Sequence, residues 1–163
     1  MAENRFICER ETVSPGEFVI CDSEQAVAAH RELFNLDSNH YVVCRDDPFE
    51  CLSSIHEKYH KVHIAASWKG MLGIALRRSH VAIDDVIYIL TCAGMSHSDL
   101  APFRQGKPDD IFPVLYYGKN FDMLRKVCNA AKKTVESHLK NIYTRIDCHL
   151  VCYETNKIIA SSL

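Results

Sequence analysis

Apolar and polar residues follow two different periods along this chain, and together the two periods predict a mixture of strands and helices. Short runs rich in β-branched and aromatic residues, bounded by turn residues, are typical of strands. Longer stretches in which apolar residues recur every three or four positions are typical of amphipathic helices. The predicted strands cover residues 5–10, 17–22, 40–45, 62–67, 111–118, 148–153 and 157–161.

The clearest helical pattern covers residues 121–143, where apolar residues repeat at spacings of three and four. Asn120 lies where its side chain can cap this helix. Two earlier helices are predicted, one capped by Asp22 and one that begins after the acidic pair at 46–47. Residues 69–93 fit either a helix or a strand, because glycines interrupt the first part and β-branched residues are dense in the second.

The order of these elements predicts an α+β fold in which residues 1–163 form a single compact domain. Hairpins at both ends, with helices between them, indicate a mixed or mostly antiparallel sheet and about four helices, the longest near 121–143. Residues 148–161 are expected to close the chain as a C-terminal β-hairpin. The chain has no internal repeat, low-complexity tract or linker that would indicate a second domain.

Composition excludes several classes of protein. Apolar residues make up 47% of the chain and charged residues 25%, which is typical of globular proteins. No stretch approaches the roughly 18 consecutive apolar residues of a membrane span. The first residues carry charges of both signs and lack the apolar core of a secretory signal. We therefore expect a soluble cytoplasmic or nuclear protein that is not secreted and does not associate with a membrane.

The chain contains eight cysteines and no C-x-x-C pair, and most of the cysteines lie inside apolar runs. Free cysteine behaves as a small core hydrophobe. We therefore predict reduced thiols rather than a disulfide framework. Cysteine ligands for a metal are a second possibility, which the spacing does not favour.

One arrangement has an immediate chemical interpretation, the sequence H-E-x-x-H at residues 56–60. On one continuous helix, His56, His60 and His63 would share a face. Imidazoles one turn apart can bind zinc, and Glu57 can then act as general base on metal-bound water. His63, or less readily Cys51, would be the third ligand of a zinc-dependent hydrolase.

The alternative is a solvent-exposed helix that happens to be rich in histidine. Lys58 lies inside the motif and Lys61 follows it, and both are typical of a solvated face. Such a short pattern arises by chance in a chain with nine histidines. No further metal-binding motif follows it, so this interpretation is favoured over the metal site.

Three other features have both a functional and a structural interpretation. Gly70 and Gly73 form a G-x-x-G that can contact phosphate or can allow close backbone packing, and packing is favoured. Asp84 and Asp85 can take part in acid/base chemistry, but an acidic pair at a helix start usually complements the helix dipole. Residues 95–110 form an irregular segment, either one wall of a ligand site or a surface connection.

The formal net charge of −2 gives no general attraction to nucleic acid, so binding of nucleic acid would need a local basic patch. The basic face of residues 125–145, together with Arg77 and Arg78, is the candidate. Asp122 and Glu136 dilute the charge of that face. A solvated helix face is therefore the default interpretation.

These observations favour a non-enzymatic interaction or regulatory domain that binds a protein or a small ligand. No G-x-G-x-x-G, Walker A or G-x-S-x-G motif is present. A protein partner or self-association is expected, and no cofactor is required. The zinc-dependent hydrolase of His56, Glu57, His60 and His63 is the alternative, and a nucleic-acid-associated protein is a weaker one.

Overall fold

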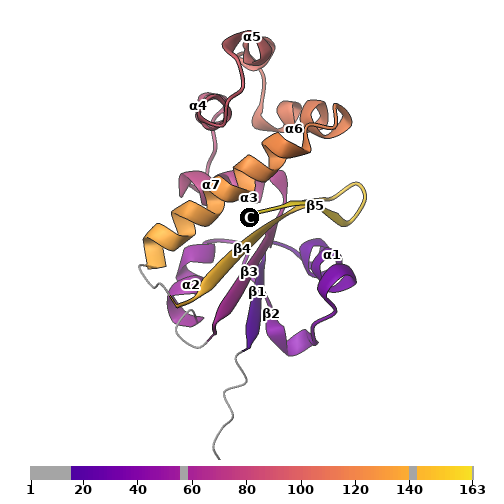
Figure 1. Cartoon of the computed structure of the whole chain (residues 1–163), viewed down its shortest axis with the longest axis vertical. Coiled ribbons are helices and arrows are strands. Elements are labelled where there is room, and N and C mark those ends of the chain that lie inside the picture. Colours follow the sequence, from indigo (N-terminus) through magenta and orange to yellow (C-terminus); the bar gives the residue numbers. More distant parts are fainter. Residues whose placement is uncertain (1–15, 56–58, 140–142, 163) are drawn as a thin grey trace, which may run out of the picture.

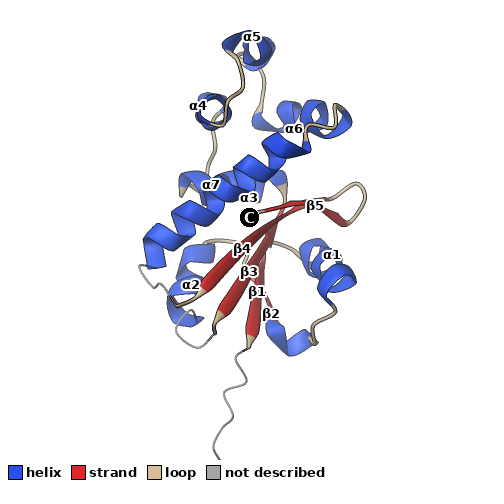
Figure 2. Ribbon diagram, viewed as in Figure 1, coloured by secondary structure: helices blue, strands red, loops and turns tan. Residues whose placement is uncertain are grey.

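A computed structural model describes residues 16–55, 59–139 and 143–162. Within them lies a five-stranded sheet in the order β2-β1-β3-β4-β5 (Figures 1 and 2). Strands β1 to β4 are mutually parallel, and β5 is antiparallel to β4. The strands are β1 (Glu17–Cys21), β2 (Tyr41–Val43), β3 (Lys61–Ala66), β4 (Arg145–Cys152) and β5 (Lys157–Ser161).

Helices cover both faces of the sheet (Figure 1). Helix α1 packs on one face, and α2, α3 and α7 pack on the other. Helices α4 and α6 pack against α7, at the end of α7 that lies farther from the sheet. The α-helices of the described residues are α1 (Glu24–Phe34), α2 (Pro48–Ile55), α3 (Trp68–Leu76), α4 (Ile83–Cys92), α5 (His97–Leu100), α6 (Pro108–Tyr117) and α7 (Phe121–Leu139).

The path of the chain explains which helix covers which face. The chain passes from β1 outward to β2, then returns past β1 to β3 and continues to β4. Because crossovers between parallel strands are right-handed, this reversal places α1 on one face and α2 and α7 on the other. The carboxyl ends of β1 and β3 are therefore neighbours whose outgoing chains turn to opposite faces, which is the topological switch point of an open α/β sheet.

Alternate side chains of β3 lie on the two faces of the sheet, and the interiors on these two faces differ. Val62, Ile64 and Ala66 enter the larger core, which is shared with α3 and α7. His63 and Ala65 lie on the opposite face, toward α1, because successive strand residues point to opposite faces. The α1 face therefore combines a small apolar cluster with buried polar groups.

The mixed sheet and the C-terminal hairpin are confirmed, but the described residues form an α/β fold rather than the predicted α+β fold, because helices join parallel strands and cover both faces of the sheet. The prediction of a mostly antiparallel sheet is wrong, because four of the five strands run parallel. The prediction of about four helices is too low, because the connection from β3 to β4 alone holds the five α-helices α3 to α7 of the described residues. The predicted strand at 5–10 lies outside the described residues.

The predicted strand over 111–118 is also wrong, because these residues belong mainly to helix α6. Pro108 occupies the first turn, where its missing N–H costs nothing. Asp110 accepts a hydrogen bond from the Lys107 backbone N–H at 2.8 Å. These helix-start signals outweigh the strand preference of the aromatic and β-branched residues that follow.

The predicted residues at the starts of two helices are confirmed. Asn120 Oδ1 accepts from the Met123 backbone N–H at 3.3 Å at the start of α7. Residues 69–93, whose state was ambiguous, form α3 and α4, and Asp84 and Asp85 lie in the first turn of α4. Residues 97–103 of the expected irregular segment form α5 and a short 3-10 helix.

Among the described residues, no helix combines the length and the hydrophobicity that are needed to cross a lipid bilayer. The cysteines of the same part of the chain are free thiols. Cys21, Cys128, Cys148 and Cys152 are buried.

The packing of the core predicts that substitutions at two leucines differ clearly in their effect on the free energy of unfolding. Leu124 of α7 is fully buried in the larger core, whereas Leu33 of α1 is 64% exposed. We expect Leu124→Ala to lower the free energy of unfolding by about 2–5 kcal/mol, because it removes packed methyl groups and leaves a cavity. Leu33→Ala should change it by less than about 0.5 kcal/mol. Urea denaturation followed by circular dichroism measures both, and equal effects would contradict the assigned packing.

Candidate functional site

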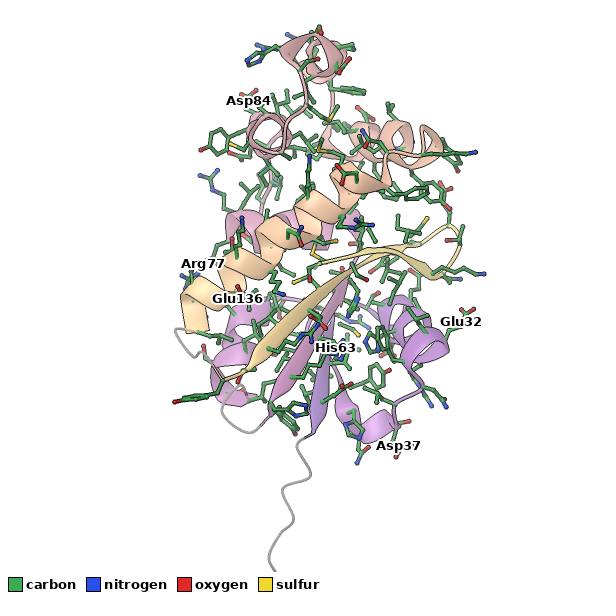
Figure 3. All side chains as sticks on the ribbon, viewed as in Figure 1. Glu32, Asp37, His63, Arg77, Asp84 and Glu136 are labelled. Carbon is green, nitrogen blue, oxygen red and sulfur yellow. The ribbon has the colours of Figure 1, made fainter. Side chains whose placement is uncertain are left out.

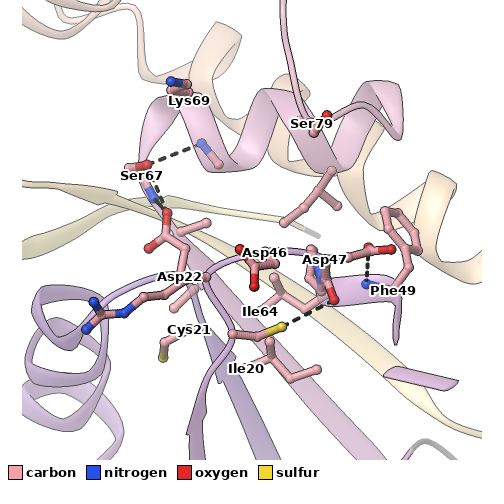
Figure 4. Close-up of a pocket in the computed structure, with 18 of the residues that line it drawn as sticks. Ile20, Cys21, Asp22, Asp46, Asp47, Phe49, Ile64, Ser67, Lys69 and Ser79 are labelled. Atoms are coloured by element: carbon pink, nitrogen blue, oxygen red, sulfur yellow. Dashed lines mark hydrogen bonds between the residues drawn. The ribbon is translucent and has the colours of Figure 1, made fainter. Parts of the chain in front are cut away.

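A cavity of about 730 Å³ opens at the switch point, over the carboxyl ends of β1 and β3 (Figure 4). Its floor is formed by Ile20 and Cys21 of β1 and by Ile64, Ala65 and Ala66 of β3. One wall is the segment that follows β2 and leads into α2, and the opposite wall is α3. We refer to this cavity as the switch-point cleft.

Asp22 connects the elements that meet at the cleft. Its Oδ2 accepts hydrogen bonds from the backbone N–H and the hydroxyl of Ser67, each at 2.9 Å. Its Oδ1 accepts from the hydroxyl of Tyr153 at 2.6 Å. The sequence predicted Asp22 as the cap of the first helix, but Ser23 is the cap, since its Oγ accepts from the Ala26 N–H at 3.1 Å. The Asp22 side chain is therefore directed across the cleft instead.

The start of α3 is built on the same contact. Ser67 donates its hydroxyl hydrogen to Asp22 and accepts from the Gly70 N–H at 3.2 Å, so it caps the helix (Figure 4). A carboxylate at this end complements the positive end of the helix dipole. Burial, followed by the hydrogen bond to Asp22, raises the pKa of Tyr153 to about 12, so this phenol stays protonated and donates at neutral pH.

Two glycines form the face of α3 that borders the cleft. A Cβ on Gly70 would overlap Oδ2 of Asp22. A Cβ on Gly73 would lie 2.9 Å from the carbonyl oxygen of Arg78, which is closer than such atoms pack. The favoured interpretation of the G-x-x-G, close packing, therefore fits both positions, and at Gly70 the close neighbour is the Asp22 carboxylate.

The rim of the cleft carries four basic side chains. Arg77 has a left-handed backbone (φ 54°) that ends α3, and its guanidinium lies 5.1 Å from the centroid of the Phe49 ring. Arg78 forms an ion pair with Asp85 at 2.7 Å. Arg45 and Lys69 are exposed and form no ion pair with any residue of the described ranges.

Acidic side chains of the cleft are fewer and are partly engaged. Asp47 Oδ1 accepts from the Phe49 backbone N–H at 3.0 Å and so caps α2, in line with the sequence prediction. Asp22 is held by its three donors. Of the cleft carboxylates in the described chain, only Asp46 is exposed and has no such partner. The accessible charge of the cleft is therefore mainly positive.

The residues of the H-E-x-x-H motif are only partly described. His56 and Glu57 lie outside the described residues, so the motif stays a prediction. His60 is exposed and precedes β3, and His63 is buried within β3. The expectation that one helix carries both His60 and His63 is therefore wrong. Cys51, the less favoured third ligand, lies on α2.

His63 instead meets two histidines that the sequence analysis did not select. His30 of α1 and His149 of β4 lie beside it on the α1 face of the sheet, and Figure 3 shows His63 in the middle of the sheet. Burial lowers the pKa of His30 and of His149 to about 3, and that of His63 is also lowered. All three rings are therefore neutral at pH 7. No spacing rule could have found them, because they come from three distant elements.

Comparison of the chain with protein-family models, with curated proteins and with solved structures found no match. Two places stand out in the described residues, the switch-point cleft and the three buried histidines.

The contact between Gly70 and Asp22 gives a prediction of unusual sign. Glycine to alanine in a helix ordinarily stabilises a protein by about 0.5–1 kcal/mol. Here we expect Gly70→Ala to lower the free energy of unfolding by about 1–3 kcal/mol, because the new Cβ displaces a carboxylate that three donors hold in place.

Chemical denaturation of a double-mutant cycle tests this prediction. In an Asp22→Ala background the overlap with the carboxylate is gone and only a 3.1 Å approach to the Ala66 Cβ remains, so Gly70→Ala should cost clearly less stability. The same loss of stability in both backgrounds would show that the Asp22 contact is not the cause.

Proposed function

We propose that this domain binds a small anionic ligand, of about the size and charge of a nucleotide, in the switch-point cleft. The observation that carries the proposal is the coincidence of a large cavity, a topological switch point and a rim of basic side chains. Ligands of open α/β sheets bind outside the carboxyl ends of the strands at this point.

The size of the cleft suits a small molecule. Ligand pockets occupy roughly 300–1,000 Å³, and the cleft, at about 730 Å³, lies within that range. Ile20, Ile64 and Phe49 make the inner lining of the cleft apolar, although each is almost fully buried.

The charges favour an anionic group near Arg45 and Lys69. These two side chains are exposed, and no described carboxylate pairs with them. Arg77 is held by its stacking on Phe49, so its planar guanidinium is already oriented at the cleft. Arginine and lysine at such a rim are the groups that recognise phosphate or carboxylate.

Binding rather than catalysis is supported by the state of the other groups in the cleft. Burial raises the pKa of Cys21 to about 12, so its thiol is not a nucleophile at neutral pH. Burial, followed by the neighbouring Cys51, raises that of Cys44 to about 12 as well, and its thiol donates to the Asp47 carbonyl at 3.2 Å. Asp22 already accepts three hydrogen bonds from the protein, so its oxygens are occupied by protein donors rather than by a substrate.

The hydrolase and nucleic-acid alternatives keep less support. The hydrolase depends on His56 and Glu57, which lie outside the described residues. On the basic face of 125–145, Lys126 forms an ion pair with Asp122 at 3.2 Å and donates to the Ala93 carbonyl at 3.0 Å. A protein partner or self-association stays a separate proposal that no contact of this structure bears on.

A ligand panel tests the proposal with AMP and ATP as anionic probes, adenosine as the uncharged match, and inorganic phosphate. We expect AMP or ATP to bind with saturation in isothermal titration calorimetry, and adenosine to bind more weakly. The double variant Arg45→Glu/Lys69→Glu should weaken nucleotide binding by about 10–100-fold, because it removes charge-assisted contacts and adds repulsion.

Lys157→Glu is the matched control, since Lys157 is exposed on β5, at the opposite edge of the sheet from β2. It should leave the affinity unchanged. If neither nucleotides nor phosphate bind, or if the double variant binds as well as the wild type, the cleft does not recognise anions.

A further inference from the structure

The three buried histidines lie on one face of the sheet because of strand register and helix packing. Ala65 of β3 lies opposite His149 of β4, so His63 and His149 are neighbours on the α1 face. Helix α1 packs over this face and brings His30 against both rings, with centroids 4.7 Å and 5.3 Å away. The three residues are 0%, 0% and 3% exposed.

Each ring has one nitrogen that is held by an outer partner. His63 Nε2 lies 3.1 Å from Glu17 Oε2. His149 Nδ1 lies 2.7 Å from the hydroxyl of Ser161, and His30 Nδ1 lies 2.8 Å from that of Tyr41. A histidine that binds a metal holds its second nitrogen in the same way, against a carboxylate or another acceptor.

The three histidines offer ligand atoms that lie close together. One ligand atom from each histidine lies within 4.8 Å of the other two. His63 Nδ1 and His149 Nε2 are 2.8 Å apart, and a single proton between them satisfies both. His30 Nε2 is buried and has no hydrogen-bond partner in the described chain. Such an orphaned nitrogen is uncommon, because a buried polar atom without a partner is destabilising.

We propose that His30, His63 and His149 form a binding site for Zn²⁺, with His30 Nε2, His63 Nδ1 and His149 Nε2 as the ligand atoms. Neutral imidazole is a ligand of zinc and of related transition metals, whereas magnesium and calcium prefer oxygen ligands. The proposal is independent of the switch-point cleft.

The rearrangement required is small. Zinc–nitrogen bonds of about 2.0–2.1 Å in a tetrahedral site separate two ligand nitrogens by about 3.3 Å. His63 Nδ1 and His149 Nε2 therefore move apart slightly, and His30 Nε2 moves in toward them. The proton on His149 moves from Nε2 to Nδ1, and the Ser161 hydroxyl turns to accept it. All three rings stay neutral, so no net proton is released.

Charged side chains lie beside the proposed site. Glu17 accepts from His63 and lies 3.7 Å from Lys61, which in turn lies 3.2 Å from Asp147. Arg145 also pairs with Asp147, at 3.3 Å. The two carboxylates and two cations balance one another, and the carboxylate that is bonded directly to a proposed ligand is Glu17. The ring of Phe34, 5.0 Å from that of His63, adds an apolar wall.

Metal analysis of the full chain tests the site. Protein stripped of metal with EDTA is equilibrated with Zn²⁺, and its bound zinc is then measured by mass spectrometry. We expect one equivalent in the wild type, and at least a 100-fold loss of affinity in His30→Ala, which removes the orphaned nitrogen. The control His97→Ala alters an exposed histidine of α5 and should bind like the wild type. Tyr41→Phe, which removes only the outer partner of His30, should weaken binding by about 10-fold.

The variant His56→Ala/His60→Ala separates this site from the H-E-x-x-H motif, and it should keep its zinc. Long-range ¹H–¹⁵N spectra of the wild type detect the imidazole nitrogens directly, so the test does not depend on any variant folding. We expect three rings to change on addition of Zn²⁺. The proposal is overturned if the wild type binds no stoichiometric zinc, if the ring signals do not move, or if loss of His56 and His60 abolishes binding.

Discussion

The reversal of the chain at β1 is the constraint on which the other features depend. Because β2 and β3 lie on opposite sides of β1, the first crossover helix and the later ones must cover opposite faces of the sheet. One consequence is the opening between the carboxyl ends of β1 and β3, where the outgoing chains separate. The other is an uneven division of the interior, with most apolar side chains between the sheet and α3 and α7.

Asp22 is the residue that makes this opening rigid. A carboxylate at the end of β1 receives donors from the start of α3 and from the residue after β4, so three segments far apart in sequence share one acceptor. Multiple donors hold a carboxylate in one orientation. The cost is steric, because α3 can approach Asp22 only where it carries Gly70. The shape of the cleft is therefore set mainly by hydrogen bonding and by the absence of one Cβ.

Local patterns in the sequence identified most elements but not their pairing. The spacing of apolar residues found β1, β3 and α7, since periodicity depends only on which side of an element is buried. It could not distinguish parallel from antiparallel pairing, which depends on crossovers tens of residues long. Strand preference failed at 111–118, where Pro108 and the Lys107–Asp110 contact start a helix. The zinc ligands proposed from the sequence were adjacent in the chain, whereas the histidines that converge come from residues 30, 63 and 149.

The two faces of β3 show why such a cluster is informative. A strand covered on both faces is normally apolar along its whole length, yet β3 has a histidine at its centre. Apolar residues of similar size in place of both His63 and His149 would cost little net stability, because hydrogen bonds between buried polar groups add little over a packed hydrophobe. Replacing only one of them would leave the nitrogen of the other unpaired. The Ser161–His149–His63–Glu17 chain could satisfy its members as a structural network. It does not account for His30, whose Nε2 has no partner in the described residues, although one ligand atom of His30 lies within 4.8 Å of those of His63 and His149. A cation there uses that nitrogen, and this is the observation that favours a metal site over a purely structural network.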